Sequence, residues 1–376
     1  MTTQHIALNG QSVPPALFEK LCELQQSQSR YRNPFFHPNF INIVSGVQDN
    51  VHLFWEEDDQ GLVFFWAMQI SRLQTGRGIG GPFADRNGPV LREGVDLDVE
   101  DFLAKNNIRK FVTNGFVNNS LNETESFEIA LNNESFVKTN YDDFYEAQKS
   151  EYNSKFKRWR RAHRQLENEC ENIVFNFDDR SDENFKKILE MKQTQYIESG
   201  LHNVLGADWS QELFSTLRQS KDEGYRIRVI TLMVDGLLVA GEINLQSQDT
   251  LHGWIVVYDR DYKKYSPGYL VVLYILEQLK PHGLSYYESG PGSEHYTKYV
   301  TNHREAVGVG TIRSQKASKP FLSFLESTWR LAEKRLPEKL AHLFQKTRRR
   351  FEQIIVTDIE LMPRLKGILH ALRSKD

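Results

Sequence analysis

Three runs of alternating apolar and polar residues follow one another between residues 226 and 259. They read RIRVITLMV, LLVAGEINLQ and TLHGWIVVYD, and the pair Asp235–Gly236 separates the first two. An Asp-Gly pair between two such runs is the strongest short signal of a β-hairpin. We therefore expect an antiparallel three-stranded meander over 226–259.

The segments around this meander have the period of helices. Residues 182–200 and 209–224 predict amphipathic helices before it, and 267–283 predicts one after it, with Pro267 near its first turn and Gly283 past its end. Residues 284–289 then read as a buried strand, and 307–313 as a further strand.

The N-terminal part alternates helix and strand in the same way. The predicted helices are 14–29 and 98–107, and the strands are 51–57, 61–73, 110–117 and 127–132. NPFFHPNFI (33–41) reads as a turn that enters a helix, and 77–89 as a Gly/Pro-rich loop. One long charged helix is expected over 141–170, and basic helices are expected after 318. These changes of character divide the chain into domains 1–140 and 141–317 and a helical extension, 318–376.

Composition narrows the class of protein. A chain of 376 residues is long enough for about two domains. The net charge of −3 gives no reason to expect a nucleic-acid partner. Cys22 and Cys170 lack the spacing of a metal site or a disulfide framework, so we expect no metal and a cytoplasmic location. No signal peptide and no apolar run long enough to span a membrane is recognisable.

Three ionisable residues within the apolar strands are candidates for catalysis. Glu242 lies in VAGEINL, where a carboxylate is costly unless its face is wet or paired, and His252 lies in the next strand. Glu288 ends the buried strand at a position where ligands of α/β proteins bind, and burial would raise its pKa and make it a better base. Each has a structural alternative: an exposed sheet face or a salt bridge for Glu242, a core position for His252 and a turn partner for Glu288.

Candidates for substrate binding lie on the long helix and in two loops. Arg160 and Arg161 could hold a diphosphate, and Trp159 could stack on a base or sugar, although a solvated helix face would have the same composition. Residues at strand ends and in the loop after 290 could orient a substrate or take part in catalysis: Tyr258, Asp259, Glu294, His295, Tyr296 and Lys298.

A series of landmarks resembles a known superfamily. These are RRAHRQLEN (160–168), VDGLLVAGEI (234–243), YD followed by YSPG opening a helix (258–268), and a strand ending at Glu288 before Gly292 and Tyr296. The series resembles the GCN5-related N-acetyltransferases (GNAT), and among them the acetyltransferases associated with bacterial cellulose and exopolysaccharide synthesis, which are related to the Fem-like nonribosomal peptidyltransferases. The sequence departs from the pattern in two places: Thr297 stands where a Lys is expected, and the phosphate loop lacks G-x-G.

The resemblance implies an α/β fold with mixed sheets, in which two GNAT-like domains lie in tandem before the helical extension. It implies an N-acyltransferase that moves an acetyl or 3-hydroxybutanoyl group from acyl-CoA to the amine of a dTDP-type amino-dideoxy sugar in O-antigen, lipopolysaccharide or capsule synthesis. Backbone amides of a splayed strand would hold the oxyanion. A side chain or a water would accept the proton. The resemblance leaves the oligomeric state undecided, and a homodimer is one alternative. The catalytic candidates are Glu288 and Tyr296, which match landmarks of the family, together with Glu242 and His252 from the apolar strands. The CoA-binding residues that the resemblance implies are Lys263, Lys264, Tyr265, Ser266 and Gly268.

Two other functions are compatible with the sequence. A Fem-type enzyme would use aminoacyl-tRNA as its donor, although the slightly acidic chain and the lack of a long coiled-coil insertion speak against it. A non-catalytic partner of a membrane polysaccharide synthase would dock through the basic helices after 318.

Overall fold

The computed structural model describes residues 2–117, 127–136, 141–220, 222–290 and 297–314. The predicted extension 318–376 lies outside these residues. In the described part, thirteen strands form one mixed sheet with the order β1-β2-β3-β4-β6-β13-β7-β12-β11-β10-β9-β8, and β5 pairs with β3. The predicted α/β class with mixed sheets is confirmed.

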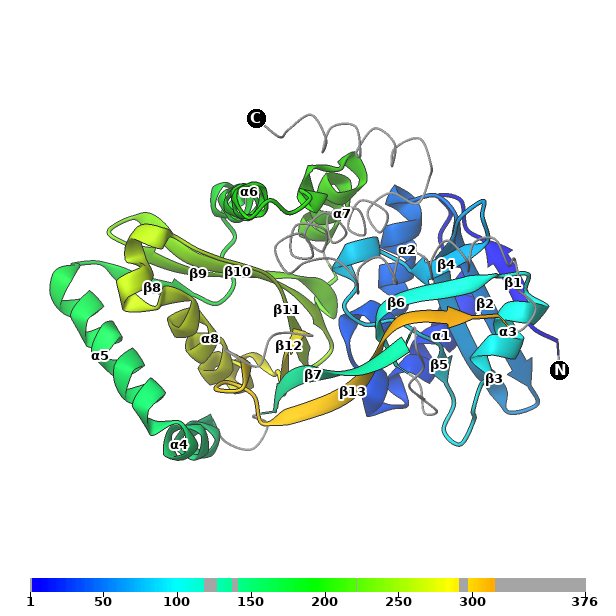
Figure 1. Cartoon of the computed structure of the whole chain (residues 1–376), viewed down its shortest axis with the longest axis horizontal. Helices are drawn as coiled ribbons and strands as arrows, with labels where there is room; N and C mark the ends of the chain where they lie inside the picture. Colours follow the sequence, from blue (N-terminus) through cyan, green and yellow to red (C-terminus); the bar gives the residue numbers. More distant parts are fainter. Residues whose placement is uncertain (1, 118–126, 137–140, 221, 291–296, 315–376) are drawn as a thin grey trace, which may run out of the picture.

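The N-terminal half forms one end of this sheet (Figure 1). Its strands are β1 (Gln4–Ala7), β2 (Val51–Asp58), β3 (Gly61–Ile70), β4 (Thr75–Gly78), β5 (Val90–Leu91), β6 (Lys110–Phe116) and β7 (Phe127–Phe136). Its helices are α1 (Pro15–Gln26), α2 (Pro38–Val47) and α3 (Val99–Lys105), with short 3-10 turns η1 (Ser29–Tyr31), η2 (Pro34–Phe36) and η3 (Gly81–Phe83). The predicted turn at 33–41 is confirmed: Asn33 caps η2 by accepting a hydrogen bond from the backbone N–H of Phe35.

The C-terminal half forms the other end. Its strands are β8 (Ile173–Asn176), β9 (Tyr225–Val234), β10 (Leu237–Ser247), β11 (Thr250–Tyr258), β12 (Tyr286–Gly290) and β13 (His303–Arg313). Its helices are α4 (Tyr141–Glu151), α5 (Asn153–Glu169), α6 (Asp182–Glu198), α7 (Asp208–Gln219) and α8 (Pro267–Gln278), with 3-10 turns η4 (Val204–Gly206), η5 (Arg260–Tyr265) and η6 (Lys280–His282). Helices α6 and α7 lie on one side of β8–β12, and α8 and α5 lie on the other (Figure 1).

The meander at 226–259 is confirmed, and so is its Asp-Gly turn. Strands β9, β10 and β11 pair antiparallel, and both Asp235 (φ 50°) and Gly236 (φ 81°) have the left-handed backbone that a tight hairpin turn needs. Helix α8 begins at Pro267, and Gly283 lies beyond its end with φ 72°, as expected from its flanking residues. The predicted helix 141–170 is instead two helices, because Tyr152 leaves the helical region (φ −116°, ψ 40°) and ends α4.

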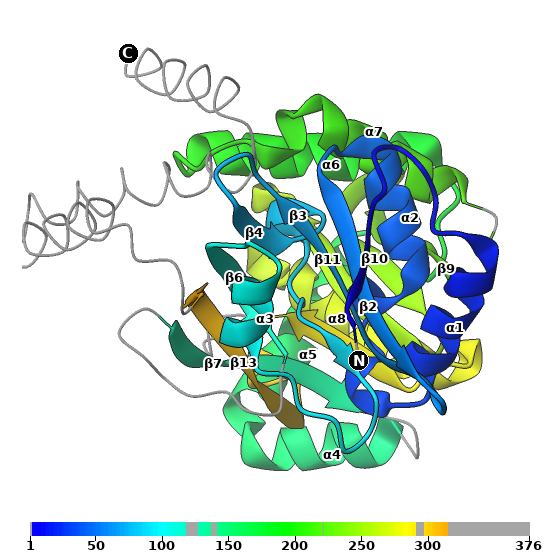
Figure 2. The ribbon, with the colours of Figure 1, turned by 90° about the vertical axis from the view of Figure 1, so that its right-hand side faces the viewer.

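The two halves are joined through strand exchange. Strand β13, the last strand of the C-terminal half, runs into the N-terminal half and pairs with both β6 and β7 (Figures 1 and 2). Strand β7 in turn pairs with β12 of the C-terminal half. The sheet is therefore continuous across the predicted boundary at residue 140, and the domain limits stay a prediction.

Two apolar cores support the sheet. One unites the N-terminal half with the α6 and α7 side of the C-terminal half, and the other lies between the meander and α8. No helix in the described ranges has the length and apolarity needed to span a membrane.

Candidate active site

Strands β11 and β12 separate partway along their length. In the described part of the chain they pair in parallel only over Thr250–His252 and Tyr286–Glu288, whereas β11 continues to Tyr258. A β-bulge lies where the strands part: Asn244 pairs with Gly253 and Ile243 with Ile255, so Trp254 has no partner in β10. The indole N–H of Trp254 donates to the carbonyl of Phe83 (2.8 Å) in the N-terminal half and fixes the bulge.

Glu242 lies at this point of separation. Its Oε1 accepts a hydrogen bond from the Tyr287 hydroxyl (2.7 Å), and a Cβ at Gly253 would lie 2.5 Å from that oxygen and 2.6 Å from the hydroxyl. Gly253 therefore leaves room for both groups beside β11. The other carboxylate oxygen of Glu242 is buried without a partner. Glu242 is fully buried, so the exposed-face alternative does not apply.

Burial changes the acidity of Glu242. Desolvation raises its pKa to about 7, although the Tyr287 hydroxyl, His252 and Lys192 oppose the rise. Lys192 of α6 also donates to the carbonyl of Val256 in β11 (3.3 Å). A carboxyl group with this pKa can exchange a proton near neutral pH, which is the property that general acid–base chemistry needs.

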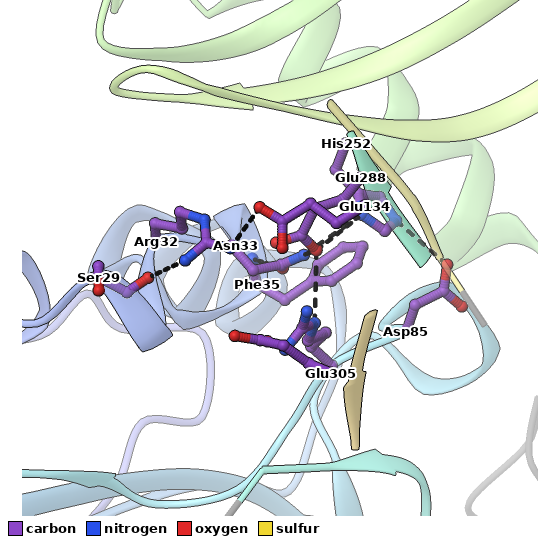
Figure 3. Close-up of polar contacts among 10 residues, drawn as sticks. Ser29, Arg32, Asn33, Phe35, Asp85, Glu134, His252, Glu288 and Glu305 are labelled. Atoms are coloured by element: carbon purple, nitrogen blue, oxygen red, sulfur yellow. Dashed lines mark hydrogen bonds and ion pairs between the residues drawn. The ribbon is translucent and has the colours of Figure 1, made fainter. Parts of the chain in front are cut away.

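His252 belongs to a second cluster, which joins the two halves (Figure 3). Its Nε2 lies 3.1 Å from Asp85 Oδ2, and its Nδ1 lies 3.3 Å from Asn33 Nδ2 and 3.7 Å from Glu288 Oε2. The Phe35 ring packs edge-on against the imidazole of His252, with 4.9 Å between the two ring centroids. Burial disfavours the charged imidazole, but the interactions with Asp85 and Glu288 outweigh it and raise the pKa of His252 to about 9.

Glu288 is held as a carboxylate in this cluster. It accepts a hydrogen bond from Asn33, and Arg86 Nε lies 3.4 Å from its Oε2. Burial alone would raise its pKa, but Arg86, His252 and Asn33 together lower it to about 2. The expectation that burial makes Glu288 a better base is wrong, because a buried arginine (1% exposed) stabilises the charged form.

The expected CoA-binding loop forms η5 and the start of α8. Ser266 adopts the left-handed conformation (φ 55°) and precedes α8, in which Gly268 is the second residue. Lys263 and Lys264 are exposed, whereas Tyr265 is buried. Glu169, the last residue of α5, contacts Lys264 Nζ (2.6 Å) and accepts a hydrogen bond from the Tyr265 hydroxyl (2.5 Å). The first turn of a helix offers backbone N–H groups to a phosphate, and Lys264 and Tyr265 are tied to a carboxylate beside it.

The expected substrate-binding residues are dispersed. Trp159 is 1% exposed and lies in the core under α8, where its ring centroid is 4.1 Å from that of Tyr269. Its ring therefore has no face for the expected stacking on a ligand. Arg160 and Arg161 are exposed on α5 at the outer edge of the C-terminal half (Figure 1). Further candidates lie elsewhere: Tyr258 is 38% exposed, Asp259 caps η5 and Lys298 lies over the Tyr299 ring. Glu294, His295 and Tyr296 lie outside the described residues.

Sequence reasoning missed the groups that come from the N-terminal half. Asn33 lies in the NPFFHPNF segment, and Asp85 and Arg86 lie in the Gly/Pro-rich loop 77–89, but only the fold brings them to β11 and β12. Arg86 in particular gave no signal, because an arginine in a polar loop is expected to be exposed.

Comparisons with known proteins agree with the resemblance of the sequence. Residues 153–298 match the acetyltransferase (GNAT) domain family. None of the curated proteins compared with this chain matches it. The structure is similar to that of FemX, with 9% identity and a TM-score of 0.54 over 87% of this chain and 100% of FemX. It also matches a tandem GNAT protein from the clavulanic acid biosynthesis pathway, with 10% identity and a TM-score of 0.45 over 83% of this chain and 98% of that protein.

The matched segment contains β11, β12, α8, Glu242 and His252, so the separated strands lie within it. The similarity to FemX extends the fold assignment over most of the chain. Residues 153–298 therefore match a GNAT acetyltransferase domain, the chain has the GNAT fold, and it is an acyltransferase.

Proposed function

We propose that the protein is a CoA-dependent N-acyltransferase whose acceptor is the amine of a nucleotide-linked amino sugar. The observation that carries the proposal is the separation of β11 from β12 at a β-bulge, with Glu242 and Tyr287 at the point where the strands part. This separation exposes the edge of β11 to a donor. Backbone N–H groups of such an edge can hold the oxyanion that forms when an amine attacks a thioester.

Glu242 is the proton acceptor in this proposal. The amine nitrogen bonds to the thioester carbonyl carbon, and the C–S bond breaks. The proton that leaves the nitrogen ends on Glu242, and CoA departs as a thiolate that takes up a proton from water. A pKa of about 7 gives Glu242 a large fraction of the basic form at neutral pH. His252 acts as a positioning residue, because Asp85 and Glu288 hold it charged and fixed between the halves.

The first turn of α8 is the proposed site for the CoA pyrophosphate. Its backbone N–H groups and the positive end of the helix dipole favour an anion, and Lys263 and Lys264 precede it. Glu169 competes for Lys264, so CoA would have to displace this contact. The sugar part of the proposal follows from the resemblance of the sequence alone, and the acyl group stays between acetyl and 3-hydroxybutanoyl.

An assay of free thiol tests the proposal directly. The enzyme is incubated with acetyl-CoA or 3-hydroxybutanoyl-CoA and a panel of dTDP-aminohexoses, and thiol release and the N-acylated product are measured. We expect release with at least one pair, and a loss of 100-fold or more in kcat for Glu242→Gln. Glu128→Gln changes an exposed carboxylate on β7 and serves as the control. Thiol release that Glu242→Gln leaves unchanged would remove Glu242 from the mechanism, and no release across the panel would refute the acceptor.

A Fem-type donor is the second candidate, and one surface favours it. Helix α5 presents an exposed basic face that could contact a polyanion, formed by Lys157, Arg158, Arg160, Arg161 and Arg164. Binding of charged tRNA that weakens steeply with salt, together with no thiol release from acyl-CoA, would favour this donor over CoA.

A further inference from the structure

Three carboxylates and a histidine lie in a row outside the proposed acyl site. Glu288 of β12 pairs with Glu134 of β7, and Glu134 pairs with His303 of β13. Residues directly opposite each other in neighbouring strands share one face of the sheet, and so do residues two apart in one strand. Glu305 therefore joins Glu134 and His303 on this face (Figure 3 shows the three carboxylates).

This row ends in an open cleft. A cavity of about 390 Å³ is lined by Ser29, Arg32, Glu134, Tyr286, Asn302, His303 and Glu305. Within it, one ligand atom each from Glu134, His303 and Glu305 lies within 4.8 Å of the other two. A divalent ion bonded at about 2.1 Å to three such atoms holds them at most about 4.2 Å apart. His303 is exposed, so its side chain can turn toward an ion held by the two carboxylates.

Glu134 supplies an independent sign that a ligand belongs here. Its side chain is 1% exposed, and its Oε1 pairs with Arg32. Its Oε2 is buried and has no hydrogen-bond partner. Leaving a buried carboxylate oxygen without a partner is costly, so a cation at this oxygen would remove a penalty that the fold otherwise carries.

The surrounding charges are compatible with a cation. Four carboxylates, those of Glu134, Glu288, Glu305 and Asp85, face three cations, Arg32, Arg86 and the charged His252, which leaves one carboxylate in excess. Arg32 takes only one oxygen of Glu134, and Arg86 Nη1 binds Oε2 of Glu305 (2.7 Å). Metal-binding carboxylates are commonly held by such outer partners, which fix the orientation of the ligand.

We propose that Glu134, His303 and Glu305 bind one divalent transition-metal ion of the Zn²⁺ or Mn²⁺ kind, with its remaining positions open to the cleft. One imidazole nitrogen and two carboxylate oxygens suit these ions better than the all-oxygen sets that Ca²⁺ and Mg²⁺ prefer. The expectation of no metal rested on cysteine spacing. Cysteine spacing cannot detect a site whose ligands come from two strands about 170 residues apart in sequence.

Titration calorimetry of the full chain, stripped of metal with a chelator, tests the site with Zn²⁺ and Mn²⁺. We expect one equivalent to bind, and at least 10-fold weaker binding for each of Glu134→Gln, His303→Gln and Glu305→Gln. His303→Gln is the decisive variant, because its exposed side chain can change without disturbing the buried ion pairs. Glu128→Gln on β7 is the control for charge.

Co²⁺ absorption separates this site from the free thiols. We expect a weak visible spectrum without thiolate charge-transfer bands, which disappears in His303→Gln. Bands from a thiolate would place the ion at Cys22 or Cys170 and overturn the proposal. The same follows from no binding by the wild-type chain, or from binding that none of the three ligand variants weakens.

Discussion

His252 and Glu242 are both fully buried beside the same pair of strands, yet burial affects them in opposite ways. His252 is surrounded by Asp85, Asn33 and Glu288, and its charged form is favoured in spite of desolvation. Glu242 has the Tyr287 hydroxyl on one oxygen and no partner on the other, and its charged form is disfavoured. The number and charge of the partners, and not the depth of burial, decide which form the fold prefers.

The difference also separates two roles. Tyr287 and Glu288 are consecutive in β12 and so point to opposite faces of the sheet. On the sheet face that carries Glu288, β12 contacts the N-terminal half through Asn33 and Arg86, and the Glu288 carboxylate has a counter-charge in Arg86. The Tyr287 side leaves Glu242 short of partners and able to change its protonation near neutral pH. A matched cluster holds the halves together, whereas an unmatched carboxyl group is suited to proton transfer.

The largest effect is expected from breaking the matched cluster. Arg86→Met removes the buried cation beside Glu288 and leaves that carboxylate without its main counter-charge. We expect a loss of roughly 3–5 kcal/mol in the free energy of unfolding, measured by urea denaturation. Lys105→Met, which breaks an exposed pair with Asp101, should change little. Equal effects of the two substitutions would show that the cluster does not stabilise the fold.

The pH dependence of stability tests His252 next. Its pKa is raised from 6.5 to about 9, so its contribution is fully present below pH 6.5 and is lost as the pH rises to 9. A shift of this size corresponds to roughly 3 kcal/mol. We expect His252→Gln to remove the decline between pH 6.5 and 9, measured by urea denaturation at a series of pH values. His282→Gln, a histidine whose pKa is lowered, should keep the decline.

Glu242 should act in a lower and adjacent pH range. Its pKa is raised from 4.5 to about 7, so the unfolded chain ionises first and stability falls between pH 4.5 and 7 by roughly 3 kcal/mol. Glu242→Gln should remove this decline and keep the decline that His252 causes at higher pH. The stability that Glu242→Gln gains over the wild type should therefore be largest above pH 7. The same denaturation series measures both effects. A decline between pH 4.5 and 7 that survives in Glu242→Gln would assign it to other groups.

The comparison also shows what the sequence could predict. Glu242 was recognisable as a carboxylate within an apolar run, and the meander that carries it followed from Asp235–Gly236. The partners were not recognisable, because Asp85 is 167 residues from His252 and reaches it only through the packing of the two halves. Periodicity predicts which face a residue occupies, but not what an element distant in sequence brings to that face. For the same reason the sign of the pKa shift at Glu288 was mispredicted.

The smallest effect concerns the single partner of Glu242. The Tyr287 hydroxyl lowers the pKa of Glu242 against the effect of burial, so Tyr287→Phe should raise this pKa further, by roughly one unit. The carboxyl signal of Glu242 in ¹³C NMR would measure the shift, and the acidic limb of the pH–rate profile should move with it if Glu242 accepts the proton.

Tyr225→Phe is the matched control for this measurement. Tyr225 is also buried, but its hydroxyl donates to the carbonyl of Pro34, so its loss should leave the Glu242 titration unchanged. If Tyr287→Phe moves the NMR titration but not the acidic limb, Glu242 titrates in the folded protein without accepting the proton of the reaction. If neither moves, the Tyr287 hydroxyl does not control Glu242, and the contrast with His252 loses its physical basis.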